Sequence, residues 1–159
     1  MPQKFLIATA VTAGLYTSAA FAGAVPSFTS VKDNTLFEDP SGLVSNGAGP
    51  TMFAGANGQA SIRRALVAFD LSSIPAGATV TSASLNINVT KNHPGSYAFD
   101  IHRMLADWGE SDSNSGTSGQ GVDAHPGDVT WNFRFFGNPA HRIPPTAPGA
   151  PFRSSGFHR

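Results

Sequence analysis

The sequence predicts an all-β protein with antiparallel sheets, built as one sandwich-like domain, and three observations lead to this prediction. Charged residues make up only 13% of the 159 residues, and the chain holds 17 Gly and 12 Pro. This composition suits short strands and turns better than helices, whose surfaces usually carry more Glu and Lys. Apolar and polar residues also alternate from Ala83 to Val89, which is typical of a strand with one buried and one solvated face.

The first half of the chain is predicted to hold three strands. Residues 29–37 form the first, and the loop 39–49 that follows carries Pro and Gly at a density that no regular element tolerates. Residues 51–54 form a short strand. Residues 62–71 form a longer one, which ends before the turn-forming sequence Pro-Ala-Gly.

The second half begins with the clearest alternation of the chain, a strand predicted at residues 79–90. Further strands are predicted at residues 96–105 and 130–136. Residues 109–127 lie between them as a long loop without periodicity, which is either a binding element or a flexible excursion. The predicted core takes apolar side chains from these strands and from the preceding one: Phe69, Leu85, Ile87, Phe99 and Ile101.

Residues 1–22 are predicted to be a secretory signal peptide. Lys4 supplies the positive charge, an apolar run follows, and Ala20-Phe21-Ala22 fits the cleavage motif before Gly23. The alternative is a retained membrane anchor, but a span needs ~20 strongly apolar residues and this segment is rich in Ala and Thr. We therefore expect a protein that is secreted, periplasmic or on the cell surface, with no membrane span after cleavage. The chain has no Cys, so disulfides do not stabilise it.

Charge and proline content divide the rest of the chain into a domain at residues 23–137 and a Pro- and Arg-rich tail at residues 138–159, predicted to be disordered. The tail holds five of the prolines, and central strands exclude proline. The formal net charge is zero. Because phosphate binding needs a clustered basic surface, nucleic acid is not expected as a partner.

The run IRRALVAFDLSSIPAGATVTSASLNI, with DNTLFEDPSGLVSNGAG upstream and HRMLADWGES downstream, resembles the DNRLRE-domain proteins of bacteria and archaea. The resemblance implies a β-sandwich of jelly-roll type in an exported or cell-surface protein. It brings no catalytic motif, and some relatives are grouped with carbohydrate-binding modules.

Members of this family usually continue after the Trp-containing strand with a Gly-Gly turn and further strands that close the sandwich. This chain does not, so we expect a sandwich that is incomplete at its C-terminus through a truncation or a shifted frame after about Phe136. A natural disordered tail is the alternative. An open sheet edge templates pairing with other chains, so self-association is expected of a truncated domain.

The segment ADWGES supplies three candidate ligand-binding residues, Asp107, Trp108 and Glu110. A carboxylate pair beside an indole suits a glycosidase, but a spacing of three in a loop does not fix the separation of the carboxylates, so we predict no catalysis. Trp108 is either a core or rim residue or a platform for a sugar ring. The other candidates are two aromatic residues and one arginine that either donates to a sugar or pairs structurally: Tyr97, Trp131 and Arg63.

Calcium is the one metal for which the sequence offers candidate ligands. Sandwich loops bind it with carboxylate and backbone oxygens, and Asp33, Asp39 and Asp70 are candidates for this role. The five histidines have no ligand spacing between them, so a zinc site is not expected.

These observations predict an exported, non-catalytic module that binds polysaccharide at or outside the cell surface. Two alternatives are a structural or assembly module of the cell envelope without a sugar site, and a non-functional gene fragment. A polysaccharide-cleaving enzyme is a third. An exposed row of aromatic side chains would favour sugar binding.

Overall fold

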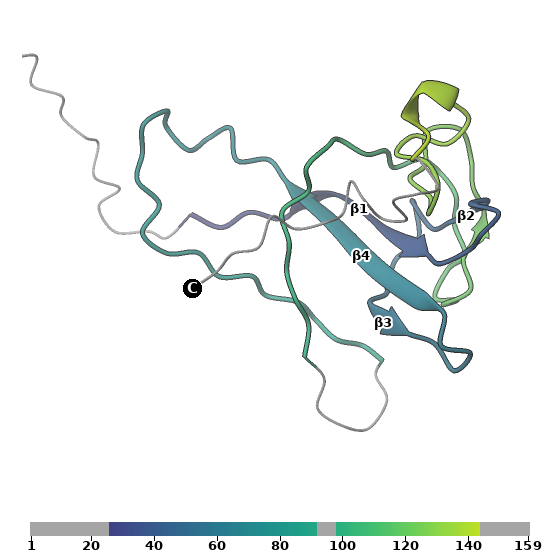
Figure 1. Ribbon diagram of the computed structural model, residues 1–159. Coiled ribbons are helices and arrows are strands. Elements are labelled where there is room, and N and C mark those ends of the chain that lie inside the picture. The colour runs from purple at the N-terminus through teal and green to yellow at the C-terminus, as the bar shows by residue number, and fades with distance from the viewer. Residues whose placement is uncertain (1–25, 92–97, 144–159) are drawn as a thin grey trace, which may run out of the picture.

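The computed structural model describes residues 26–91 and 98–143. Its strands pair in two antiparallel sheets, with the orders β1-β4-β3 and β2-β5 (Figure 1). The predicted all-β class with antiparallel sheets is therefore confirmed. In chain order the elements are β1 (Ser30–Phe37), β2 (Val44–Ser45), β3 (Gly55–Ala56), β4 (Ile62–Phe69), β5 (Val122–Asp123) and the short 3-10 helix η1 (Pro139–His141).

The two long strands are β1 and β4, and both agree with the strands predicted from the sequence. They pair antiparallel with Asp33 opposite Val67 and Phe37 opposite Arg63. In the second half of β1 four successive residues are buried, because Asn34 and Leu36 face the core while Thr35 and Phe37 are covered on the other side. This half of β1 therefore lies inside the molecule.

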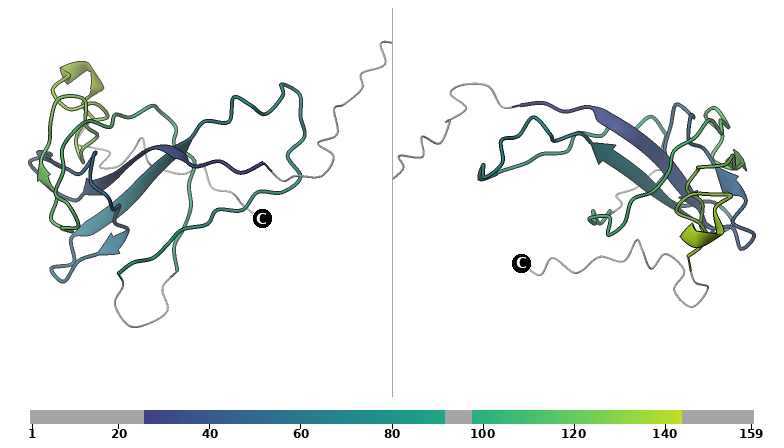
Figure 2. Two further views of the ribbon diagram at one scale, coloured as in Figure 1. Left: turned by 180° about the vertical axis from the view of Figure 1, so that it is seen from behind. Right: turned by 90° about the horizontal axis from the view of Figure 1, so that it is seen from above.

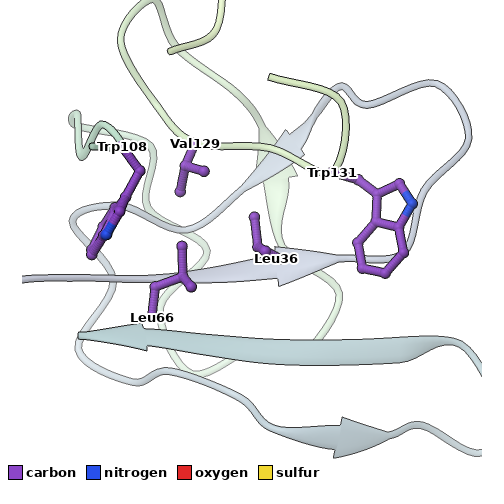
Figure 3. Close-up of a cluster of buried hydrophobic side chains, with 5 residues drawn as sticks. All are labelled: Leu36, Leu66, Trp108, Val129 and Trp131. Carbon is purple, nitrogen blue, oxygen red and sulfur yellow. The ribbon is translucent and has the colours of Figure 1, made fainter. Parts of the chain in front are cut away.

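The core consists of β1, β4 and residues that follow position 107. Its side chains form one cluster in which the two indoles lie at opposite ends (Figure 3): Leu36, Leu66, Trp108, Val129 and Trp131. None of these residues belongs to the core predicted from the sequence. Of that predicted core, Leu85 is 40% exposed, Ile87 55%, Phe99 64% and Ile101 76%, while Phe69 is half-buried.

Four predicted strands are wrong or displaced. Residues 79–90 and 98–105 carry no strand, and residues 130–136 form turns with a single bridge from Phe133 to Arg142. The strand expected at residues 51–54 is replaced by β3, which begins just after it. A strand requires a hydrogen-bonded neighbour, and alternation alone does not provide one.

The loop at residues 109–127 is packed against residues 45–49. The Asn46 Oδ1 accepts hydrogen bonds from the Ser115 backbone N and Oγ at 2.8 and 2.7 Å, and the Gly47 N donates to the Ser113 Oγ at 2.9 Å. At Gly109 a Cβ would lie 1.7 Å from the Gly127 carbonyl oxygen. Of the two predictions for this loop, a flexible excursion does not fit such close packing.

The packed body extends past position 137, where the predicted domain ends. The Asn138 Oδ1 accepts from the Ala140 N at 3.1 Å and so caps η1. Ile143 is buried, and its N donates to the Asn132 carbonyl at 2.8 Å. Residues 138–143 are thus part of the fold, which corrects the predicted boundary. The predicted signal peptide and the rest of the predicted tail lie outside the described residues.

Candidate functional site

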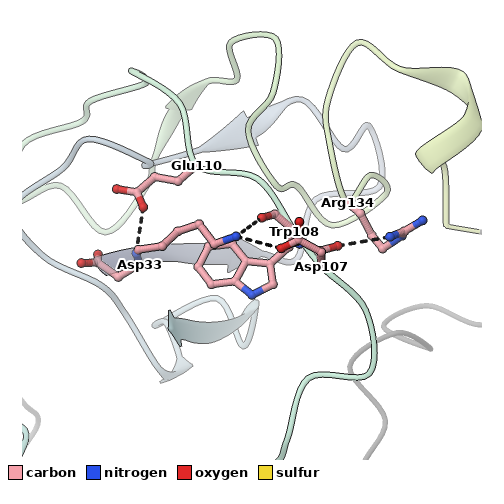
Figure 4. Close-up of polar contacts among 6 residues, drawn as sticks. Asp33, Asp107, Trp108, Glu110 and Arg134 are labelled. Atoms are coloured by element: carbon pink, nitrogen blue, oxygen red, sulfur yellow. Dashed lines mark hydrogen bonds and ion pairs between the residues drawn. The ribbon is translucent and has the colours of Figure 1, made fainter. Parts of the chain in front are cut away.

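The segment that supplies three of the six predicted ligand-binding residues folds back onto β1. Trp108 is only 3% exposed, and the Nζ of Lys32 lies 4.5 Å from the centroid of its indole ring. The same Nζ is 2.9 Å from the Asp107 Oδ1 and donates to the Trp108 carbonyl at 2.5 Å (Figure 4). Lys32 therefore covers the indole and fixes its backbone at the same time.

Two further contacts hold this segment in place. The Glu110 Oε2 accepts a hydrogen bond from the Asp33 backbone N at 3.0 Å, and the Arg134 Nη1 donates to the Asp107 carbonyl at 3.2 Å (Figure 4). We call this set the Trp108 cluster, and its members are Lys32, Asp33, Asp107, Trp108, Glu110 and Arg134.

Ionisation differs between the carboxyl groups of the Trp108 cluster. The hydrogen bond from Lys32 lowers the pKa of Asp107, whereas burial raises the pKa of Asp33 and of Glu110. One carboxyl group with a raised pKa near another with a lowered pKa resembles an acid–base pair. Here, however, the Asp107 carboxylate is bound to Lys32 and the Glu110 carboxylate to a backbone N–H, so structural roles account for both. The predicted absence of catalysis stays a prediction.

The other predicted ligand residues are held in the interior or fall outside the described residues. Trp131 is 9% exposed, and the Arg64 guanidinium lies 4.8 Å from its ring centroid. Arg63 is buried, stacks on the Phe37 ring and donates to the Gly119 carbonyl at 3.2 Å. The structural role weighed for Arg63 thus fits better, with the Ser61 hydroxyl and backbone carbonyls as partners in place of a carboxylate. Tyr97 lies outside the described residues.

Burial has a direct consequence for the predicted sugar platforms. A ring that stacks on a sugar must present an open face, and both indoles are covered by core side chains and by a cation. Trp108 and Trp131 are therefore core residues here, which is the structural alternative weighed for Trp108. Among the large apolar side chains exposed in residues 26–91 and 98–143, Phe99 is the one aromatic.

The three candidate calcium ligands are not brought together. Asp39 follows one end of the β1–β4 pair and accepts from the Leu43 N and the Ser41 hydroxyl, while Asp70 follows the other end and accepts from the Ser72 N. Each of these carboxylates stabilises its own turn. In the part of the chain that the structure describes, no three His, Asp or Glu side chains are grouped to hold a metal ion.

A further candidate surface lies at residues 79–91, which we call the exposed segment. After β4 the chain leaves the packed body and runs away from the end that carries β2 and η1 (Figures 1 and 2). Every residue of the segment is exposed, and its large apolar side chains are 40–67% exposed: Val80, Leu85, Ile87 and Val89. Leu85, Ile87 and Val89 would share one face of an extended strand.

A second sequence feature marks this segment. Residues 71–90 contain no Asp, Glu, Lys or Arg, so the whole strand-like stretch lies between Asp70 and Lys91 without a charge. Exposed edge strands in monomeric proteins usually carry charges that prevent pairing with other chains. The absence of such charges was the signal that could have distinguished a pairing surface from an ordinary solvated strand.

No family model, no curated protein and no solved structure matches this chain. The resemblance to DNRLRE-domain proteins therefore gains no support and stays a prediction. The described residues also include no helix whose length and apolar character would let it cross a bilayer.

Proposed function

We propose that this protein is an exported, non-catalytic assembly module whose exposed segment becomes a β-strand when it pairs with another polypeptide. The carrying observation is the solvent exposure of Leu85, Ile87 and Val89 in a stretch whose alternation otherwise fits a half-buried strand. Large apolar patches on soluble proteins mark interaction sites. Export rests on the signal-peptide sequence.

The free energy of pairing comes from apolar burial. Full burial of a Val, Leu or Ile side chain contributes about 1.5–3 kcal/mol, so the three side chains together supply several kcal/mol. On pairing, the backbone exchanges its hydrogen bonds with water for inter-strand hydrogen bonds. Phe99 and Ile101, which follow in the described residues after position 97, are also exposed.

Pairing also offers a route to the predicted sandwich. The described sheet β1-β4-β3 has one short edge strand, because β3 spans only Gly55–Ala56. A sandwich of jelly-roll type needs a second sheet over the core. We propose that strands formed on assembly complete it. Polysaccharide binding stays a prediction from the sequence, because the described residues offer no exposed row of aromatic side chains in its favour.

The test combines sedimentation velocity with hydrogen exchange over a range of protein concentrations. We expect association as concentration rises, together with slower exchange in residues 79–91. Ile87→Lys places a charge on the apolar face and should abolish both effects. Asn88→Lys adds the same charge to the opposite face and is the matched control, which should retain association. A monomer with unprotected residues 79–91 at every concentration would overturn the proposal.

A further inference from the structure

Building on the proposed function, we infer that the partner of the exposed segment is the same segment of a second copy, paired antiparallel about a two-fold axis at Asn86. The exposed segment is self-complementary in this arrangement. Its odd-numbered positions from Ala83 to Val89 are apolar, and the even-numbered positions from Ser82 to Asn88 are polar. Two copies of one surface related by a two-fold axis form the commonest kind of homodimer interface.

Charge decides the direction of pairing. In a parallel, in-register pair the two copies of Lys91 would lie on adjacent strands about 4.8 Å apart, and like charges at that position are unfavourable. In the antiparallel pair about Asn86, each Lys91 lies opposite Thr81. The two lysines then lie at opposite ends of the pair, and no charged residue opposes another within the segment.

Apolar matching decides the register. Residues directly opposite each other project to the same face of a sheet. With Asn86 on the axis, Leu85 lies opposite Ile87 twice, and Ala83 lies opposite Val89 twice. Every apolar residue on that face therefore meets another apolar residue.

The neighbouring registers are less well matched. An axis at Leu85 places Val89 opposite Thr81, and an axis at Ile87 places Ala83 opposite Lys91. A shift by a single residue would turn the apolar face of one copy to the polar face of the other.

On the opposite face of the pair, each polar residue lies opposite another polar residue. Ser84 lies opposite Asn88 twice, and Asn86 lies opposite its own copy. Hydroxyl and amide groups at directly opposed positions can hydrogen-bond across strands. The pair thus has one apolar face for packing and one solvated face, which is the usual arrangement of an antiparallel sheet.

The absence of cysteine from the chain makes the inference directly testable by disulfide trapping. In the Asn86→Cys variant the two introduced cysteines face each other at a Cα separation of about 4.5–5.5 Å, which a disulfide can bridge. In the Ser84→Cys and Asn88→Cys variants, each cysteine lies four residues, or about 13 Å, from its own copy. All three positions are exposed and lie on the polar face, so Ser84→Cys and Asn88→Cys are matched controls for Asn86→Cys.

Under mild oxidation we expect Asn86→Cys to form a disulfide-linked dimer at least about tenfold faster than either control. An equal mixture of Ser84→Cys and Asn88→Cys should cross-link between the two variants. Equal cross-linking of all three single variants would indicate a parallel pair and overturn the inference. So would association in sedimentation velocity without rapid cross-linking of Asn86→Cys, although the proposed assembly function would stand. A monomer that does not cross-link would overturn both.

Discussion

Strand β1 and the exposed segment were both predicted to be strands, but only β1 forms one in the structure. β1 pairs with β4 along its length, and from Asn34 to Phe37 it is buried on both faces. The exposed segment has a more regular alternation, yet its apolar side chains lie in solvent. Alternation therefore specifies which side chains share a face, whereas their burial depends on a partner from elsewhere in the chain or from another chain.

For β1 that partner comes from far along the sequence. Trp108 and Val129 complete the core beside Leu36, and Lys32 binds the segment that carries Trp108. In the described residues Leu85 and Ile87 remain 40% and 55% exposed, whereas Leu36 is fully buried. The stability of the isolated molecule should therefore reside in the body around β1, and the capacity for association in the exposed segment.

The sharpest test of this difference is the same truncation made in both regions. Leu36 is fully buried, so Leu36→Ala should lower the free energy of unfolding by about 2–5 kcal/mol. Leu85→Ala should change it by less than about 0.5 kcal/mol when measured at concentrations where the protein is monomeric. Chemical denaturation of both variants and the parent protein measures the two values.

Equal losses of stability for the two variants would contradict this difference between the two regions. They would mean that Leu85 is packed in the monomer, as the sequence alone predicts for a complete sandwich. At high protein concentration the loss of stability caused by Leu85→Ala should be larger, because association through the exposed segment then contributes to stability. The loss of stability caused by Leu36→Ala should not depend on protein concentration.

A second test asks whether the loop at residues 109–127 belongs to the stable body. At Gly109 a Cβ would lie 1.7 Å from the Gly127 carbonyl oxygen and 2.7 Å from the Phe135 ring, so Gly109→Ala should cost about 1–3 kcal/mol. Gly58→Ala is the control, since no heavy atom lies within 4 Å of a Cβ there, and it should change stability by less than about 1 kcal/mol. Thermal unfolding distinguishes the two. A neutral Gly109→Ala would place the loop outside the cooperative unit.

The fold was predictable where the pattern is local. Residues 29–37 and 62–71 were predicted as strands and correspond to β1 and β4, because turn-forming residues follow both. The core was not predictable, since it depends on which distant segment covers a face. Trp108, Val129 and Trp131 lie in stretches without a strand, and nothing in their spacing shows that they meet Leu36.

For the candidate site, too, the local grouping was predictable and the contacts with distant residues were not. The sequence identified Asp107, Trp108 and Glu110 as neighbours, and the structure does group them. The sequence could not show that Lys32, 75 positions earlier than Asp107, would cover the indole of Trp108. Nor could it show that the clearest strand pattern would be exposed, because an amphipathic face looks the same whether its cover is in this chain or in another.

The smallest expected effect concerns the ion pair that attaches Asp107 to β1. The hydrogen bond from Lys32 lowers the pKa of Asp107, so the charged carboxylate contributes stability above the unfolded-state pKa and loses this contribution as pH falls through the folded-state pKa. Because the Asp107 side chain is 76% exposed, solvent screens the pair, and Asp107→Asn should cost only about 0.2–1 kcal/mol near neutral pH.

The pH dependence separates this effect from general loss of packing. The stability difference between the parent protein and Asp107→Asn should shrink between about pH 5 and pH 2, and about 1 M salt should also reduce it at neutral pH. Asp100→Asn, at another exposed position, is the matched control and should show a smaller difference. Denaturation curves across this pH range measure both variants. A difference that persists at low pH would mean that Asp107 acts through its shape or its hydrogen bonds to backbone, and that the charge of Lys32 does not hold this segment on β1.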